Sequence, residues 1–182
     1  MIHTRGPPAL VSFRGSADCS TEAMTRLPYA IGEVRGSDAA GVYEVERRCF
    51  PDPYPPALLE DLMRTQRNRF FVASNAGEVV GYAVATTTGR DGHIVSVAVD
   101  PDHRRQGIGT RLLSATIRRL IEDGVGQIHL EVRKSNGTAI AFYERMGFRI
   151  RSEIKRYYSD GEDAWVLVRS TERAPTTVDE GG

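Results

Sequence analysis

A basic segment with two spaced glycines contains the residues of this chain that are best suited to chemistry. It follows the apolar residues 97–99 and an aspartate, includes Gly107 and Gly109, and leads into a helical pattern. Glycine lacks a Cβ, so the main chain can approach a ligand closely, and unpaired N–H groups at a helix start carry positive potential. The segment therefore predicts a pyrophosphate site, although the glycines alone also fit a turn that binds nothing.

The residue order in this segment does not match the other common phosphate-binding loops. A Walker loop ends in Gly-Lys-Ser/Thr, and the dinucleotide fingerprint needs a third glycine and a later ribose-binding acid. Arg104, Gly107 and Gly109, spaced Arg-x-x-Gly-x-Gly after Val-Ala-Val-Asp, instead resemble the acetyl-CoA loop of the GNAT acetyltransferase superfamily. This resemblance implies coenzyme contacts from Val97, Ala98, Val99, Arg104, Arg105, Gln106, Gly107, Ile108, Gly109 and Thr110.

A second block, residues 130–148, joins a strand pattern to a helical one. Asn136 and Tyr143 stand about two helical turns apart, so they fall near one face, and Gly147 is typical of a helix stop. These features also fit a tyrosine that only packs at the helix end. The block resembles RimI-like protein N-terminal acetyltransferases, which implies that Asn136 contacts the coenzyme and that Tyr143 protonates its departing thiolate.

Two further side chains are candidates for proton transfer. Glu131 alternates with Leu130 and Val132, so it should face away from their apolar side, toward a ligand. The resemblance implies that Glu131 takes the proton of the attacking amine, through water; a solvated carboxylate on a strand is the alternative. His93 matches a family position near the amine. A histidine side chain has an unperturbed pKa near ~6.5, so this residue is a candidate proton relay, or alternatively a surface or capping histidine.

Paired tyrosines and a proline-rich bend are candidates for binding the acceptor. Tyr157 and Tyr158 precede Asp160-Gly161, a strong hairpin signal that also fits a simple turn. The segment resembles the hairpin that covers the substrate in archaeal and eukaryotic N-terminal acetyltransferases, which implies that both tyrosines bind the first residues of a peptide. Asp52 stands where archaeal relatives often have a catalytic glutamate and is one methylene shorter, whereas Tyr54 would line the peptide pocket.

The elements that position these residues predict an α/β or α+β fold. Strands are expected at 30–35, 70–73, 79–87, 93–99 and 128–132, and helices at 37–50, 58–62 and 110–123. The last two strands enclose a helix, which favours a right-handed crossover and parallel pairing. The resemblance adds a mixed, mostly antiparallel sheet flanked by helices, whose two central strands splay apart so that acyl-CoA pairs with the backbone of Val97 and Val99.

Apolar stripes indicate which helix faces are buried. The helix at 37–50 should bury Val42, Val45 and Cys49. The helix at 110–123 should end at Gly124 in a left-handed conformation and bury Leu113, Ile117, Leu120 and Ile121.

Length, charge and cysteine content narrow the class of protein. The 182 residues suit one domain, and a formal net charge of zero argues against a broad basic surface for nucleic acid. Cys19 and Cys49 are too few for a disulfide framework or a cysteine metal site. No apolar run approaches the ~18 residues of a membrane span. We therefore expect a cytoplasmic protein without membrane or direct nucleic-acid binding.

The two ends differ from the middle of the chain. Residues 1–27 mix Gly, Pro, Ser and Arg without periodicity, and residues 171–182 are similarly polar. We expect a disordered tail at 1–27, an acetyltransferase domain at 28–170 and a flexible tail at 171–182. Because recognisable structure begins soon after Met24, Met24 is a candidate for the biological start.

The resemblance implies an acetyl-CoA-dependent N-acetyltransferase that uses no metal and acetylates the α-amine of a protein or peptide. Association with a ribosomal protein or with the ribosome is part of this expectation. An α-amine has a pKa near ~8 and a lysine near ~10.4, so a weak, water-mediated base suits the α-amine better. Two alternatives stay open. One is acetylation of lysines or of a small amine such as an antibiotic or polyamine, and the other is a non-catalytic acyl-CoA-binding sensor.

Overall fold

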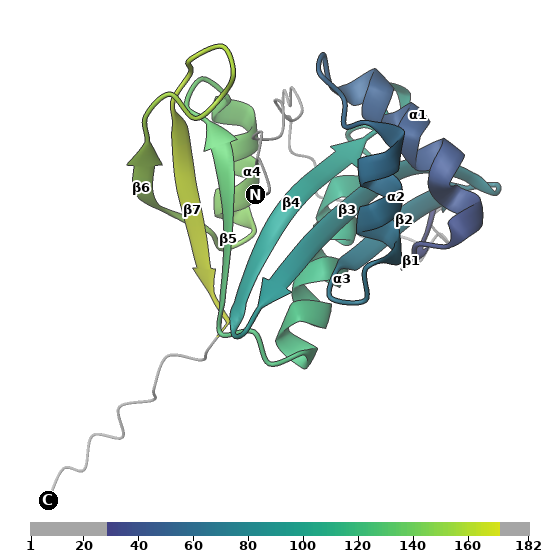
Figure 1. Ribbon diagram of the computed structural model, residues 1–182, viewed down its shortest axis with the longest axis horizontal. Helices are drawn as coiled ribbons and strands as arrows, with labels where there is room; N and C mark the ends of the chain where they lie inside the picture. The colour runs from purple at the N-terminus through teal and green to yellow at the C-terminus, as the bar shows by residue number, and fades with distance from the viewer. Residues whose placement is uncertain (1–28, 172–182) are drawn as a thin grey trace, which may run out of the picture.

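The computed structural model describes residues 29–171, and its strands form one seven-stranded sheet (Figure 1). The strands are β1 (Tyr29–Glu33), β2 (Arg69–Asn75), β3 (Glu78–Thr88), β4 (Asp91–Val99), β5 (Gln127–Arg133), β6 (Arg149–Ile154) and β7 (Ala164–Ser170). Their order in the sheet is β1-β2-β3-β4-β5-β7-β6. The expected tails and Met24 lie outside the described residues except for Thr171, whose N–H donates to the Gly126 oxygen (3.1 Å).

Helices cover both faces of this sheet and enclose two hydrophobic cores. The helices are α1 (Ala39–Cys49), α2 (Pro56–Arg64), α3 (Ile108–Glu122) and α4 (Gly137–Arg145). Residues of α3 and α4 share one core with Val97 and Val99, whereas residues of α1 and α2 share the other with Ala98. Successive side chains of a strand point to opposite faces, so β4 contributes to both cores. The expected mixed fold with flanking helices is confirmed.

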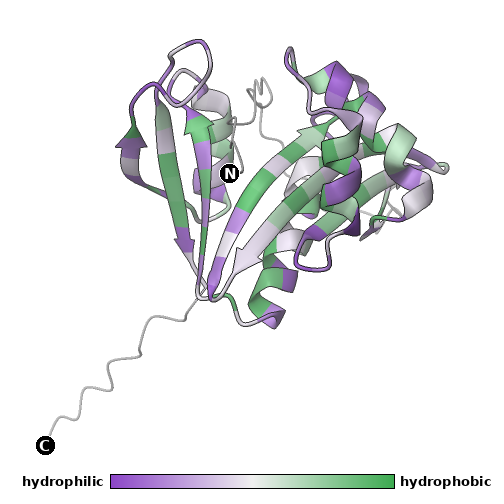
Figure 2. Cartoon of the chain, viewed as in Figure 1, coloured by the Kyte–Doolittle hydropathy of each residue, from purple (hydrophilic) through white to green (hydrophobic). Residues whose placement is uncertain are grey.

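The hydropathy of the strands follows their position in the sheet. Figure 2 shows that β3 carries hydrophobic residues in its middle and is pale toward its C-terminal end, whereas the edge strand β6 is largely hydrophilic. All but one of the residues of β6 are exposed. A charged edge strand resists pairing with other chains, so this edge is protected from aggregation.

The helix α3 follows the expected pattern with one difference. Leu113, Ile117 and Leu120 are buried and Gly124 has a φ of +80°, as expected, but Ile121 is 44% exposed. Successive residues of a helix are rotated by about 100° around its axis. Leu120 lies in the middle of the buried stripe, so Ile121 falls outside it. Among the described residues, no helix has the length and apolar character that crossing a membrane requires.

The parallel pairing of β4 with β5 is confirmed, and it is short. The pairs are Asp91↔Gln127, Gly92↔Ile128 and His93↔His129, with none beyond them in the described chain. On their other sides, β4 pairs with β3 as far as Val99, and β5 pairs with β7 as far as Arg133. Figure 1 shows the two strands moving apart beyond their short contact. The expected splayed strand pair is therefore present.

Every second residue at the end of β4 directs its backbone N–H and C=O groups toward the gap between β4 and β5. The Asp100 N–H donates to the Val80 oxygen on β3 (2.9 Å). In an antiparallel ladder, neighbouring residues direct their N–H and C=O groups to opposite sides. Val99 and Val97 therefore direct theirs away from β3, toward the side where no strand of residues 29–171 pairs with them.

Candidate active site

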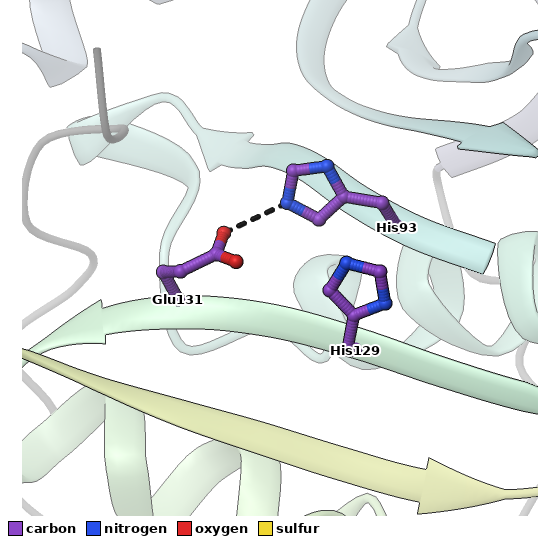
Figure 3. Close-up of side chains that lie close together, drawn as sticks. All are labelled: His93, His129 and Glu131. Atoms are coloured by element: carbon purple, nitrogen blue, oxygen red, sulfur yellow. Dashed lines mark hydrogen bonds and ion pairs between the residues drawn. The ribbon is translucent and has the colours of Figure 1, made fainter. Parts of the chain in front are cut away.

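Three side chains meet where β4 and β5 separate (Figure 3). Residues 129 and 131 are two positions apart on β5, so His129 and Glu131 share a face, and His93 is the β4 partner of His129. The His93 Nε2 lies 2.8 Å from the Glu131 Oε2, and the rings of His93 and His129 stack with centroids 4.7 Å apart. The side chains of His93 and Glu131 are 22% and 11% exposed. Two predicted catalytic residues are thus in direct contact and accessible.

The surroundings of this cluster set its charge. Burial raises the pKa of Glu131, but hydrogen bonds from His93 and Tyr157 and the charges of both histidines outweigh it and hold that pKa below its ordinary value. Burial and the neighbouring charge of His93 lower the pKa of His129. Glu131 is therefore ionised and His129 is neutral at neutral pH. An ionised carboxylate that holds a histidine can accept a proton from that ring or from water.

His129 is not among the residues singled out from the sequence, although a signal for it exists. The segment Ile128-His129-Leu130-Glu131-Val132 alternates apolar and polar residues, and the apolar ones are buried. The same alternation that places Glu131 toward a ligand places His129 beside it.

The two tyrosines of the β6–β7 loop have different surroundings. Tyr157 is half-buried, and burial and the charge of Glu131 raise its pKa. Tyr158 is buried, and the Arg133 guanidinium lies 3.9 Å from the centre of its ring. The Tyr158 hydroxyl is buried without a hydrogen-bond partner among the described residues. Tyr157 is thus the tyrosine beside the His93–Glu131 pair, while Tyr158 packs behind it, edge-on to the Tyr157 ring at 5.2 Å.

Charged side chains fix the loop that carries these tyrosines. Arg133 on β5 bonds Asp160 (2.8 Å) and Glu162 (2.7 Å), and the Arg156 N–H donates to Asp163 (2.9 Å). Because Arg133 lies two residues after Glu131 on β5, the loop is held over the same strand that carries the carboxylate.

The bend between α1 and α2 is anchored by a buried carboxylate that sequence analysis did not identify. Glu46 on α1 is fully buried; its Oε1 accepts the Tyr54 N–H (2.9 Å), and its Oε2 accepts the Tyr82 hydroxyl. The Tyr82 hydroxyl also lies 3.0 Å from the Ser96 Oγ. Burial raises the pKa of Glu46. A charged residue within the apolar stripe of α1 is the signal that marks this position.

Glu46 positions Tyr54, the residue expected to line the acceptor pocket. Tyr54 is half-buried, and its pKa is raised to about 12 by burial and then by the charges of Glu46 and Glu131. Asp52, by contrast, is exposed.

The glycine-spaced loop forms the uncapped start of α3. Gly107 has a φ of +76° and precedes the helix, and the Arg111 N–H donates to its oxygen (3.0 Å). No side chain of residues 29–171 caps this end, and the N–H groups of Ile108, Gly109 and Thr110 have no acceptor within the helix. A Cβ at Gly107 would meet no described atom within 4 Å. The loop is therefore open to a ligand and carries positive potential.

Side chains of the same loop have distinct roles. The Arg104 Nε donates to the Val99 oxygen (3.0 Å). The thiol of Cys49 on α1, which forms no disulfide within the described part of the chain, donates to the same oxygen (3.2 Å). The Gln106 side chain accepts a hydrogen bond from Tyr29, whereas Arg105 is exposed with a φ of +65°. Arg104 thus fixes the Val99 peptide, and Arg105 extends into solvent.

The helix α4 presents the last two candidates. Asn136 precedes the helix rather than belonging to it, and its Oδ1 accepts the Ala139 N–H (3.1 Å). The Asn136 Nδ2 is buried without an acceptor among the described residues, an arrangement that proteins seldom tolerate. Tyr143 is buried edge-on to Phe148 at 5.8 Å, and burial raises its pKa. Tyr143 therefore stays protonated at neutral pH.

Comparison with known proteins adds independent information. Residues 39–148 match the Acetyltransferase (GNAT) family. An N-alpha-acetyltransferase of Sulfurisphaera tokodaii is 35% identical over 159 residues, which cover 80% of this chain and 95% of that protein. The N-alpha-acetyltransferase RimI of Mycobacterium tuberculosis is 34% identical over 152 residues, 79% of this chain and 94% of that protein. The crystal structure of the ribosomal-protein-S18-alanine N-acetyltransferase from Escherichia coli matches with a TM-score of 0.74 and 30% identity, covering 82% of this chain and 98% of that chain.

Proposed function

Because this chain belongs to the GNAT acetyltransferase family, it is an acyltransferase, and we propose that it acetylates the N-terminal α-amine of proteins or peptides. The observation that carries this proposal is the contact between His93 and Glu131, at 2.8 Å, where β4 and β5 separate. A proton acceptor at this place can serve an amine that approaches along the divergence. The names of the relatives from S. tokodaii and M. tuberculosis favour the α-amine as the acceptor.

Acetyl-CoA is the acetyl donor of the family, and three features support a site for it here. The N–H groups at the start of α3 would bind the pyrophosphate. The backbone of Val97 would pair with the amides of the pantetheine arm, and the Val99 N–H would face the thioester, because both point to the side that no described strand occupies. The Asn136 Nδ2 is a buried donor that a coenzyme oxygen would satisfy.

The reaction follows from these positions. The neutral amine attacks the thioester carbonyl carbon, a C–N bond forms, and the C–S bond breaks as the tetrahedral intermediate collapses. The amine proton passes through water to the His93–Glu131 pair, and the Val99 N–H stabilises the oxyanion. Tyr143, protonated because it is buried, gives its proton to the departing thiolate.

The acceptor would bind between the α1–α2 bend and the β6–β7 loop. Tyr157 lies beside Glu131 and would border the place where the amine must arrive, and Tyr54, held by Glu46, would line the pocket from the bend. Tyr158 would support Tyr157 from behind. Asp52 would meet the more distant part of the acceptor, because it is exposed.

The cellular setting is part of the same proposal. The name of the E. coli structure includes a ribosomal protein, which supports a protein N-terminus as acceptor and the cytoplasm as location. The acetyltransferase domain would span residues 28–170, with tails at 1–27 and 171–182.

An acceptor panel tests the proposal. Acetyl-CoA is supplied with peptides that have free N-termini, with the same peptides blocked at the N-terminus but containing lysine, and with polyamine and antibiotic amines. We expect acetylation of the free N-termini alone, located by fragmentation mass spectrometry. Acetylation of lysine or small amines without the free N-termini would contradict it, and tight coenzyme binding without turnover would favour a sensor.

A further inference from the structure

A set of metal-binding side chains lies at the separation of β4 and β5. Donor atoms of His93, His129 and Glu131 all lie within 4.8 Å of one another. The sheet creates this convergence, because the two histidines are paired across neighbouring strands and Glu131 follows His129 by two residues on one face. All three side chains are partly exposed, so an ion can reach them from solvent.

We propose that these three residues bind a Zn²⁺ ion, and that the ion inhibits acetyl transfer. Two imidazole nitrogens and one carboxylate oxygen are a ligand set that Zn²⁺ accepts, with water in the fourth position. Mg²⁺ and Ca²⁺ prefer sites made of oxygen ligands, so this set selects against them. The inhibitory part rests on the proposed function, but the binding part does not.

The present geometry is close to what the ion requires. Zn–N and Zn–O bonds of about 2.1 Å at a tetrahedral angle place two ligand atoms about 3.4 Å apart. The His93 Nε2 and the Glu131 Oε2 are 2.8 Å apart, so they must separate by roughly half an ångström. The His129 ring stacks nearly parallel to that of His93, at 7°. Because the nitrogen lone pairs lie in the ring planes, the His129 ring must rotate out of this stack to direct a nitrogen at the same point.

Zn²⁺ would inhibit because it binds both groups that are proposed to accept the amine proton. In the metal-free protein, a proton lies between the His93 nitrogen and the Glu131 oxygen. The ion replaces that proton, which is released to solvent, and neither group can then accept the proton of an amine. Binding should therefore weaken as the pH falls, because protons compete for the histidines.

Calorimetric titration of the full-length chain with ZnCl₂, without coenzyme, tests the binding. We expect one saturable site per chain that MgCl₂ does not fill. His129→Asn should weaken Zn²⁺ binding at least tenfold, and His129→Gln should act in the same way. His103→Asn is the matched control, because His103 is also partly exposed but lies beside Asp100, outside the cluster. Failure of the parent chain to bind Zn²⁺, or equal affinity of the parent and both His129 variants, would overturn the proposal.

A second experiment tests the inhibition. The acetylated peptide is measured by mass spectrometry at initial rates, because free coenzyme A thiol itself binds Zn²⁺. We expect Zn²⁺ to inhibit the parent, a chelator to restore the rate, and His129→Asn to raise the half-inhibitory concentration at least tenfold. If no acceptor is acetylated, the calorimetry still decides on the metal site. If acetylation proceeds and Zn²⁺ does not bind, this inference alone fails.

Discussion

His93 and His129 form the last backbone pair between β4 and β5, and their rings stack at 4.7 Å with an angle of 7° between the planes. The reactive groups are therefore positioned by the register of two parallel strands rather than by a loop. Strand backbones are more rigid than loops, so the His93–Glu131 contact should already exist before any substrate binds.

Removal of the Glu131 charge should reduce turnover without loss of coenzyme binding. We expect Glu131→Gln to lower kcat by about 10²-fold or more, because general-base catalysis contributes on that order. The Kd for acetyl-CoA should stay unchanged, because Glu131 lies close to the last β4–β5 pair and not at the loop before α3 that would bind the pyrophosphate. Steady-state kinetics and calorimetry measure both, with the exposed Glu122→Gln on α3 as control. A fully active Glu131→Gln would exclude Glu131 as the base.

Loss of the Tyr143 hydroxyl should act on kcat more than on KM for acetyl-CoA. Tyr143→Phe keeps the ring that packs against Phe148 and removes the proton donor for the thiolate. We expect kcat to fall about tenfold or more with little change in thermal stability. Tyr43→Phe on α1, far from α4 in sequence and on the opposite face of the sheet, serves as control. Unchanged kinetics would mean that another group protonates the thiolate.

A side chain at Gly107 should block the coenzyme. Gly107→Val introduces a β-branched residue at a φ of +76°, which costs about 1–2 kcal/mol or more of stability, although no described atom clashes with the Cβ. Gly89→Val is the matched control, because Gly89 has a φ of +60°, equally open surroundings and a place in the β3–β4 turn. Both variants should melt earlier, but only Gly107→Val should raise the Kd for coenzyme A at least tenfold. Equal affinity of the two variants would argue against the loop as the pyrophosphate site.

The lowered pKa of His129 makes stability depend on pH. Between the unfolded value, about 6.5, and the lower folded value, the unfolded chain binds more protons, so stability falls as the pH drops. His129→Asn should therefore lose less stability than the parent between pH 7.5 and pH 5.5. The lowered pKa of Glu131 adds a loss with the same sign, but only as the pH falls below about 4.5. Urea unfolding at the two pH values measures the difference, and identical losses in both proteins would contradict the expectation.

Glu46 should affect both stability and acceptor binding. Glu46→Ala leaves the Tyr54 N–H and the buried Tyr82 hydroxyl without their acceptor, which should cost about 2–3 kcal/mol. If the fold survives, KM for the peptide should rise more than KM for acetyl-CoA, because Tyr54 loses its anchor. Glu46→Gln retains one acceptor oxygen, so its stability and its KM for the peptide should fall between those of the parent and Glu46→Ala. The exposed Glu44→Ala on the same helix is the control, and an unchanged peptide KM in Glu46→Ala would remove Glu46 from acceptor binding.

Local patterns predicted much of this structure. The parallel pairing of β4 with β5 followed from the strand–helix–strand order, and the direction of Glu131 followed from alternation along one strand. Both depend on residues near one another in the chain. The expected roles of Glu131, Tyr143 and Asn136 remain predictions.

Other features depend on contacts that no local pattern contains. His129 meets His93 because of the register between two strands, and a strand's periodicity does not specify its partner residue. Glu46 meets Tyr82 across 36 positions of sequence. The Arg133 guanidinium lies over the Tyr158 ring, a contact between β5 and the loop after β6, and the expected role of Tyr158 in peptide binding stays a prediction. Tertiary packing, rather than local preference, determined these three placements.

The short ladder between β4 and β5 means that a ligand bound between these strands would complete the hydrogen bonding of the sheet. Within residues 29–171, only three residue pairs connect the two strands at the centre of the sheet. A ligand that adds hydrogen bonds along the remaining length would join the two strands there, and its dissociation would remove those bonds. The melting temperature should therefore report coenzyme occupancy directly.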